Sequence, residues 1–208
     1  MPIKKSSSKE VLRDFKKSQK IADLTEVWFD EIDDLRNADF KKITAVKSKP
    51  LIYKVTKQNK LYEDILRIID YIDFDIKTSN SKITNAKKSN PKIKLIISFH
   101  DFKKTPSSNE LKLITKKAIA KGADIVKIAA YARDFTDTMK MFESLTQLQK
   151  QRKDAICICM GKEGLLTRTA GHLLGNYLMY APIDKSGSTA DGQITVAELR
   201  KIQKLRNL

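Results

Sequence analysis

The sequence predicts an α/β fold, most specifically a (β/α)8 barrel of the TIM type. Apolar runs of strand length recur at steps of ~20–30 residues, and stretches with helical spacing lie between most of them. This alternation indicates a parallel sheet covered by helices. Few turns are rich in glycine and no dinucleotide-binding fingerprint is present, which favours a barrel over a doubly wound sheet.

Seven apolar runs are predicted to be strands, at residues 22–30, 50–55, 71–76, 94–100, 123–131, 155–161 and 177–183. A (β/α)8 barrel needs an eighth strand. The only candidate is "MPIKK" at the start of the sequence. The first strand is therefore expected to be short or missing.

Three stretches between these runs have clear helical spacing. Residues 108–122 begin at a serine suited to capping and end at a glycine, as helices do. Residues 195–205 read as an amphipathic helix. Residues 134–150 repeat four large apolar side chains on one predicted face: Phe135, Met139, Phe142 and Leu145. No linker interrupts this pattern, so residues 1–208 are expected to form one barrel domain.

The composition fits a soluble globular protein. Its 208 residues suit one substantial core, and 41% of them are hydrophobic. No run approaches the roughly 18 apolar residues that a membrane helix needs, and the first ten residues lack the apolar segment of a secretory signal. Cys157 and Cys159 are the only cysteines, and their spacing on one strand is poor for a disulfide. A reducing cytosol is expected.

The net charge of +16 raises the question of a nucleic-acid partner. The lysines are scattered along the chain, however, and no RNA-binding aromatic signature or zinc-ligand spacing accompanies them. A solvated, lysine-rich surface explains the charge better than a dedicated nucleic-acid site. The expected partner is a small-molecule substrate, and a homodimer is among the oligomeric states that the sequence allows.

His100 is one of only two histidines, and it stands where the apolar run 94–100 ends. Active sites of TIM-type barrels lie at the carboxyl ends of the strands, so this position favours a catalytic role. Taken alone, a structural histidine is an equally good interpretation. Other strands are expected to end at Asp30, Asp75, Tyr131 and Met160.

Lys127 is the second unusual residue, because it interrupts the apolar run 123–131. A buried ammonium is costly, so such a lysine tends towards the neutral amine, which attacks ketones to form Schiff bases. The alternative is a lysine that reaches solvent or pairs with a carboxylate. Adjacent strands lie ~4.8 Å apart, so Asp75, His100 and Lys127 on consecutive strands form a plausible catalytic set.

At these residues the sequence resembles type I 3-dehydroquinate dehydratase, the Schiff-base enzyme of the shikimate pathway. The resemblance covers nearly the whole chain, and its motifs follow in the family's order. The less specific motifs are "ADLTEVWFDEIDDL", "KPLIYKVT" and "YIDFDI". The four specific ones are "IISFHDFKKTP", "GADIVKIA", "MGKEGLLTRTAGHLLGN" and "STADGQITVAEL".

The resemblance implies a mechanism for three of these residues. Lys127 attacks the ketone of 3-dehydroquinate and forms an imine, which acidifies the neighbouring carbon. His100 removes that proton and later delivers one to the departing hydroxyl. Asp75 matches the family's glutamate and orients His100. No metal or organic cofactor is implied.

The resemblance also implies a substrate-binding set. Arg168 takes the substrate carboxylate, for which a guanidinium fork is suited. Thr189 and Gln193 close over the substrate from the loop "DKSGSTADGQ", which is typical of a mobile lid. Glu26 from the first motif and Met160 from the end of its strand complete this set.

The chain departs from the family pattern at several of these positions. Trp28 and Thr56 stand where the family usually carries arginines, and Asp75 is one methylene shorter than the usual glutamate. Asp191 replaces a common proline in the lid. Lys54 shares strand parity with Thr56 and is a candidate for the missing positive charge, although a rim lysine without function explains it equally well.

The remaining candidates favour structural roles. His172 lies on a predicted helix, and Cys157 and Cys159 lack further ligands at metal spacing, so packing explains both cysteines. Three functional hypotheses stay open at this point. They are a 3-dehydroquinate dehydratase, a diverged Schiff-base barrel with another keto acid as substrate, and a catalytically weakened binding protein.

Overall fold

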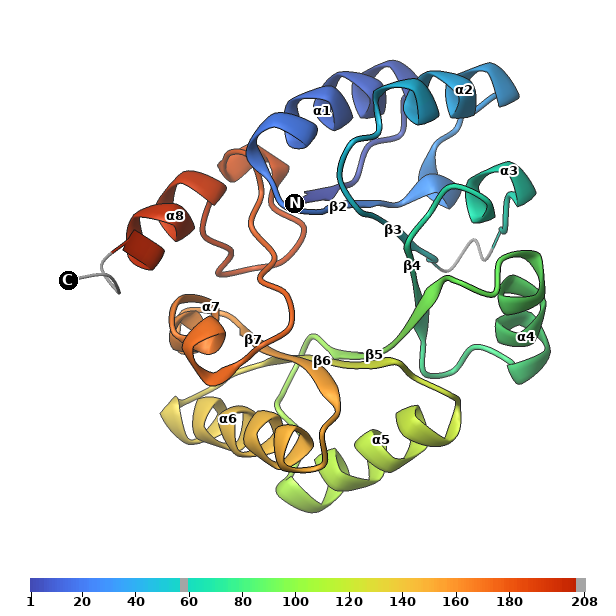
Figure 1. Cartoon of the computed structure of the whole chain (residues 1–208). Helices are drawn as coiled ribbons and strands as arrows, with labels where there is room; N and C mark the ends of the chain where they lie inside the picture. The colour runs from blue at the N-terminus through green and yellow to red at the C-terminus, as the bar shows by residue number, and fades with distance from the viewer. Residues whose placement is uncertain (57–59, 205–208) are drawn as a thin grey trace. The chain divides into compact units, whose positions relative to one another are not determined.

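The computed structural model describes residues 1–56 and 60–204. In this part of the chain, seven parallel strands alternate with helices (Figure 1), which is the arrangement of a TIM-type α/β barrel, as predicted. The strands are β1 (Pro2–Ile3), β2 (Thr25–Val27), β3 (Leu51–Lys54), β4 (Tyr71–Asp75), β5 (Lys94–Asp101), β6 (Ile125–Tyr131) and β7 (Asp154–Met160).

The α-helices are α1 (Ser8–Ile21), α2 (Asn37–Val46), α3 (Glu63–Leu66), α4 (Asn80–Ser89), α5 (Ser108–Ala120), α6 (Phe135–Lys150), α7 (Leu165–Thr169) and α8 (Val196–Lys204). Short 3-10 helices lie at Phe29–Glu31, Gly171–Leu174 and Lys185–Gly187. Throughout the described residues, no helix has both the length and the apolar character needed to cross a membrane.

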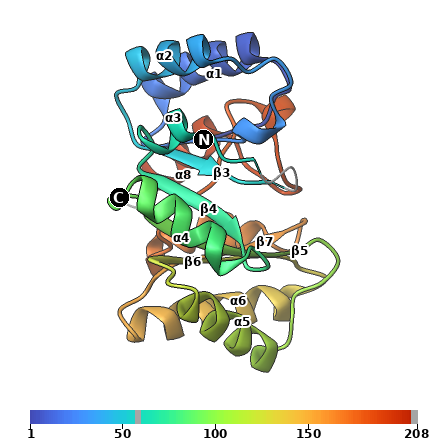
Figure 2. The ribbon, with the colours of Figure 1, turned by 90° about the vertical axis from the view of Figure 1, so that its right-hand side faces the viewer.

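The chain divides into two compact units, Met1–Leu95 and Ile96–Leu208. In the first unit, β1 to β4 pair in chain order, and α1 and α2 lie side by side (Figure 2). Its core holds fully buried aromatic rings, and those of Phe29 and Tyr53 meet edge to face with centroids 5.3 Å apart.

In the second unit, β5, β6 and β7 pair in parallel, and α5 packs beside α6 (Figure 2). One face of these strands carries buried apolar side chains, including Ile97, Ile128 and Cys157, and α6 packs on β7. Helix α5 begins with a capping box between Ser107 and Glu110, which satisfies backbone N–H groups of its first turn.

The N-terminal strand is confirmed and short. β1 comprises only Pro2 and Ile3, and it pairs with Glu26 and Val27 of β2.

The predicted strand at 177–183 is wrong, because the structure describes this whole segment and it forms no strand. Tyr177 donates its backbone N–H to the Ala155 carbonyl, but Pro182 has no N–H to continue a ladder.

The predicted apolar face of residues 134–150 is only half right. Phe142 and Leu145 are buried, whereas Phe135 and Met139 are 56% and 48% exposed. Met141 and Leu148 are buried instead, so the packed stripe is displaced around the helix. Helix α8 begins at Val196, close to the predicted start at residue 195, and residue 205 of that prediction lies outside the described residues.

Candidate active site

Lys127 lies in the middle of β6 and is only 5% exposed. Its register neighbours are Ser98 on β5, which is fully buried, and Ile156 on β7. The Lys127 Nζ lies 4.1 Å from the centroid of the Tyr180 ring. The face of an aromatic ring attracts a cation, so Tyr180 stabilises positive charge on this nitrogen.

His100 lies near the carboxyl end of β5, half-buried, and is in register with Ala129 of β6. Side chains alternate along strands and paired residues share a face, so His100 lies on the same face as Ser98 and Lys127. The imidazole stacks on the ring of Phe102, with centroids 6.1 Å apart and planes 13° apart. His100 therefore stands two residues beyond the rung of Lys127, towards the rim where barrel sites are found.

Met160 ends β7 and is in register with Tyr131, the last residue of β6. Both belong to the Lys127 face by alternation, and Met160 is buried. The next residue, Gly161, has a φ of 83°, and a Cβ there would lie 2.9 Å from the Tyr131 ring. Glycine is thus needed at position 161, because any side chain would be strained at this positive φ and would clash with the Tyr131 ring.

Arg168 lies on α7 and is only 2% exposed. Its Nη2 donates to the backbone carbonyl of Asp191 over 3.3 Å. Its Nε and Nη1 are buried without a hydrogen-bond partner in the part of the chain that the structure describes. Burial lowers the pKa of this guanidinium to about 10, so the group remains cationic at neutral pH. A buried cation with two unused donor nitrogens is suited to an anionic ligand.

The loop that carries Thr189 and Gln193 is docked against the end of β7. The Gln193 side chain is buried, and its Oε1 accepts the Thr189 N–H over 2.8 Å. Gly192, with a φ of 76°, lies so close to Gly161 that a Cβ would meet the Gly161 carbonyl oxygen at 2.7 Å. The loop thus packs on Gly161 through Gly192 and is hydrogen-bonded to Arg168 through the Asp191 carbonyl.

In the first unit, Glu26 of β2 is buried, and its Oε1 accepts a hydrogen bond from the Trp28 indole over 3.0 Å. The ammonium of Lys4 lies 4.5 Å from the Trp28 ring centroid and 3.7 Å from a Glu31 carboxylate oxygen. Trp28, which replaces the family's arginine, thus holds the Glu26 carboxylate. The nearby positive charge comes from Lys4 instead.

Lys54 forms a buried ion pair with Asp73. Its Nζ lies 2.8 Å from the Asp73 Oδ1, and these residues are direct register partners on β3 and β4. Asp73 is fully buried and Lys54 is 8% exposed. Lys54 ends β3, so it does lie at the rim of this strand, but it is buried and ion-paired rather than solvated. By strand alternation, Glu26, Lys54, Asp73 and Asp75 share one face of the first unit.

Asp75 ends β4 and caps its own turn, because its Oδ1 accepts the Lys77 N–H over 2.8 Å. Its proposed role as the partner of His100 stays a prediction.

Thr56 occupies the position of the second missing arginine. It donates its N–H and its hydroxyl to the Asp30 Oδ2 over 2.8 Å and 3.0 Å. Both family arginine positions are thus occupied by side chains that hydrogen-bond to carboxylates.

The two cysteines behave as packing residues. Both are buried, and burial raises the pKa of Cys157 to about 12 and that of Cys159 to about 11. Thiols held neutral in this way are poor nucleophiles and poor metal ligands. Within the described ranges, no group of three or more histidine, cysteine, aspartate or glutamate residues could hold a metal ion.

Sequence reasoning missed two members of this site, Tyr180 and Asp73. The signal for Asp73 was present, because aspartate in the middle of an apolar strand needs a buried partner. Tyr180 lay in a segment predicted as a strand, and its contact with Lys127 depends on the irregular path that the chain takes there. His172 has both ring nitrogens buried without a hydrogen-bond partner among the described residues, and its predicted structural role stays a prediction.

Parallel strands with covering helices, and polar side chains on one strand face within each unit, define a protein of the α/β-barrel class. The model of the type I 3-dehydroquinase family matches residues 1–208. The chain belongs to the type I 3-dehydroquinase family and is thereby a hydro-lyase.

Named relatives agree with this membership. The chain is 31% identical to the 3-dehydroquinate dehydratase of Methanococcus vannielii, over 99% of the chain and 98% of that relative. It is 30% identical to the chloroplastic bifunctional 3-dehydroquinate dehydratase/shikimate dehydrogenase of Arabidopsis thaliana, of which it spans only 36%. The crystal structure of the 3-dehydroquinate dehydratase from Geobacillus kaustophilus superposes with a TM-score of 0.84 at 22% identity, covering 99% of this chain and 89% of that one, and confirms the fold.

Proposed function

We propose that this enzyme dehydrates 3-dehydroquinate to 3-dehydroshikimate through an imine on Lys127. The observation that carries the proposal is a lysine buried in an apolar strand, on the same face as a histidine on the neighbouring strand. The amine adds to the ketone and one water leaves, giving an iminium that withdraws electrons from the neighbouring carbon. The ring of Tyr180, 4.1 Å from Nζ, stabilises this cation.

His100 is the group we assign to proton transfer. It takes the proton from the carbon next to the iminium, and the electron pair of the broken C–H bond moves into the iminium system to give an enamine. Collapse of the enamine expels the substrate hydroxyl, which leaves as water with the proton returned by His100. Hydrolysis of the product imine then frees Lys127, so the net change is the loss of one water from the substrate.

Arg168 is proposed to bind the substrate carboxylate. Its Nε and Nη1 are buried donors that lack an acceptor among the described residues, and a carboxylate supplies two acceptor oxygens in the geometry of a guanidinium fork. Thr189 and Gln193, which are hydrogen-bonded to each other beside Arg168, are assigned to the same end of the substrate. Met160, buried at the end of β7, supplies an apolar wall.

The first unit is proposed to supply polar contacts to the substrate hydroxyls. Glu26 and Lys54 share a strand face and are both buried, Glu26 with the Trp28 indole and Lys54 with Asp73 as partners. Asp75, on the same face, is assigned to orient His100. A positioned carboxylate fixes the tautomer of a catalytic imidazole and favours its protonated form.

The substitutions at Trp28 and Thr56 support a second candidate function. Each of these side chains is hydrogen-bonded to a carboxylate, where other members of the family carry arginines for the substrate. A keto acid with fewer hydroxyls would suit such a pocket. Comparing kcat/KM for 3-dehydroquinate and for keto acids that keep the departing hydroxyl but lack its other ring hydroxyls separates these alternatives.

A cytoplasmic location, a homodimer and the absence of a nucleic-acid partner remain proposals.

The test of the main proposal is turnover of 3-dehydroquinate by the purified chain, measured by the absorbance of the conjugated double bond of the product. Lys127→Met should abolish turnover, whereas Lys116→Met, which removes an exposed lysine of α5, should retain it. Activity that survives Lys127→Met would overturn the assignment.

A further inference from the structure

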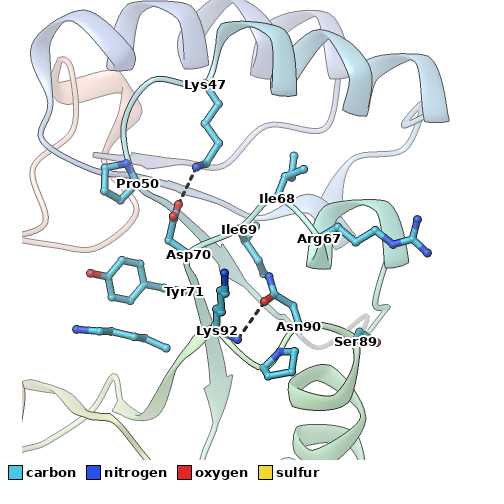
Figure 3. A pocket seen from close by; sticks show the side chains of 12 residues that line it. Lys47, Pro50, Arg67, Ile68, Ile69, Asp70, Tyr71, Ser89, Asn90 and Lys92 are labelled. Atoms are coloured by element: carbon cyan, nitrogen blue, oxygen red, sulfur yellow. Dashed lines mark hydrogen bonds and ion pairs between the residues drawn. The ribbon is translucent and has the colours of Figure 1, made fainter.

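A cavity of about 780 Å³ lies at the amino ends of β3 and β4, within the first unit (Figure 3). The turns that precede β3, β4 and β5 form its walls. Lys54 and Asp75 lie at the opposite, carboxyl ends of the same strands. The cavity is therefore separate from the residues of this unit that the proposed dehydratase uses. Its volume falls in the range of small-molecule sites, ~300–1,000 Å³.

The lining of this cavity is strongly basic. Four cationic residues, Lys47, Arg67, Lys92 and Lys94, stand against one carboxylate, that of Asp70. Asp70 is already engaged, because its Oδ2 lies 2.9 Å from the Lys47 Nζ (Figure 3) and accepts the Leu51 N–H over 2.8 Å. Among these lining residues, no second carboxylate offsets the charges of Arg67 and Lys92.

The wall that carries Lys92 is fixed by a side-chain amide. Asn90 Oδ1 accepts the Lys92 N–H over 3.1 Å (Figure 3), and Asn90 Nδ2 donates to the Leu66 carbonyl over 2.9 Å. One amide thus joins the turn after α4 to the end of α3. Pro91, whose ring restricts the backbone, lies between Asn90 and Lys92. The turn is held in place without a ligand, which lowers the ordering cost of binding one.

The remaining wall is partly apolar. Pro50 and Tyr71 lie together on one side of the cavity, and Arg67 lies on the other (Figure 3). Ile69 lies between these sides in the lining. The combination of separated cations and an apolar wall matches a molecule with an anionic group and an organic body.

We propose that this cavity binds a small organic polyphosphate, with its phosphates at Arg67 and Lys92 and its organic part against Pro50 and Tyr71. Guanidinium and ammonium groups are the side chains best suited to phosphate oxygens. The net charge of +16 raises the local concentration of such anions around the protein. The concave shape favours a small molecule over a nucleic-acid strand, which is bound along an extended basic groove with stacking aromatic side chains.

The test is calorimetric titration of the full chain with ATP and with inorganic pyrophosphate. Both should bind with one site per chain, and ATP should bind more tightly because only ATP contacts the apolar wall. The variant Arg67→Ala,Lys92→Ala should lose at least about tenfold in affinity for both. Lys116→Ala,Lys162→Ala removes two exposed charges elsewhere and should leave both affinities within about twofold.

Equal losses in the two double variants would mean general electrostatic attraction and would overturn the proposal. So would the absence of saturable binding. A single-stranded oligonucleotide that binds more tightly than ATP through Arg67 and Lys92 would show a nucleic-acid surface instead. Binding is measured without turnover, so this result is independent of the dehydratase assignment.

Discussion

Ser98 of β5 and Lys127 of β6 are direct partners in the parallel register of the second unit. Strand alternation then places His100 on the face of Lys127, two residues further towards the carboxyl end. The imidazole and the amine are thus held by neighbouring strands of one sheet, and no loop has to move to bring them to the same face. The proposed proton transfer beside an imine on Lys127 requires two groups that are positioned in this way.

Replacing His100 should separate imine formation from proton transfer. In His100→Ala the amine of Lys127 remains, so the imine should still form, while kcat should fall by ~10²–10⁴-fold because the proposed general base is lost. Steady-state kinetics with 3-dehydroquinate measures this change. The matched control is His172→Ala, which removes the other histidine and should leave kcat within about twofold. Nearly unchanged turnover in His100→Ala would assign the proton transfer to another group.

Replacing Arg168 should change activity and stability in opposite directions. A buried guanidinium with two unsatisfied nitrogens costs folding free energy, so Arg168→Met should leave the melting temperature unchanged or raise it. The same change removes the charged donors that we propose bind the substrate carboxylate, so kcat/KM should fall by at least ~10-fold. Thermal unfolding and kinetics on one preparation test both statements. A lower melting temperature with unchanged kcat/KM would show a purely structural arginine.

The Lys54–Asp73 pair should be far more sensitive than a surface pair. Lys54→Met leaves the fully buried Asp73 carboxylate without its ammonium, which should cost ~3–5 kcal/mol of unfolding free energy. The double variant Lys54→Met,Asp73→Leu should recover much of that loss. Lys42→Met breaks the exposed pair with Asp39, which at 2.9 Å is nearly as short as the 2.8 Å of Lys54–Asp73, and should cost less than ~1 kcal/mol. Urea unfolding of these three variants decides whether burial, rather than distance, sets the difference.

Restoring the family's arginines should improve the dehydratase. Trp28→Arg keeps a donor near the Glu26 carboxylate and adds a charge, and Thr56→Arg keeps the backbone hydrogen bond to Asp30. If the pocket binds 3-dehydroquinate, the double variant should raise kcat/KM by ~10²-fold or more, since each charge-assisted hydrogen bond contributes roughly 1.5–3 kcal/mol. Trp28→Phe is the control that removes the indole donor without adding charge. A natural enzyme already near ~10⁶ M⁻¹s⁻¹, with no gain in the variant, would contradict this prediction.

The sequence predicted well wherever an apolar run and its parity decide the structure. Lys127 and His100 fall on one face because β5 and β6 are long, apolar and regularly paired. The alternation of side chains along each strand could not predict that Lys54 pairs with Asp73. Which residues of two strands lie opposite each other depends on the loop between the strands. The composition of residues 177–183 is typical of a strand, but the segment forms none. Pro182 cannot donate a backbone hydrogen bond, and the chain follows an irregular path around Tyr180 despite its strand propensity. On α6, the position of its neighbours, rather than the spacing alone, decides that Phe135 stays exposed.

The central claim is that the Lys127 amine forms the imine. Incubation with 3-dehydroquinate, reduction with borohydride and peptide mapping by mass spectrometry test it directly. We predict one reduced adduct per chain, located on Lys127 and absent from Lys127→Met, with Lys116→Met labelled as in the unmodified sequence. An adduct on Lys54 or on any other lysine, or an active enzyme that forms no adduct, would contradict the mechanism.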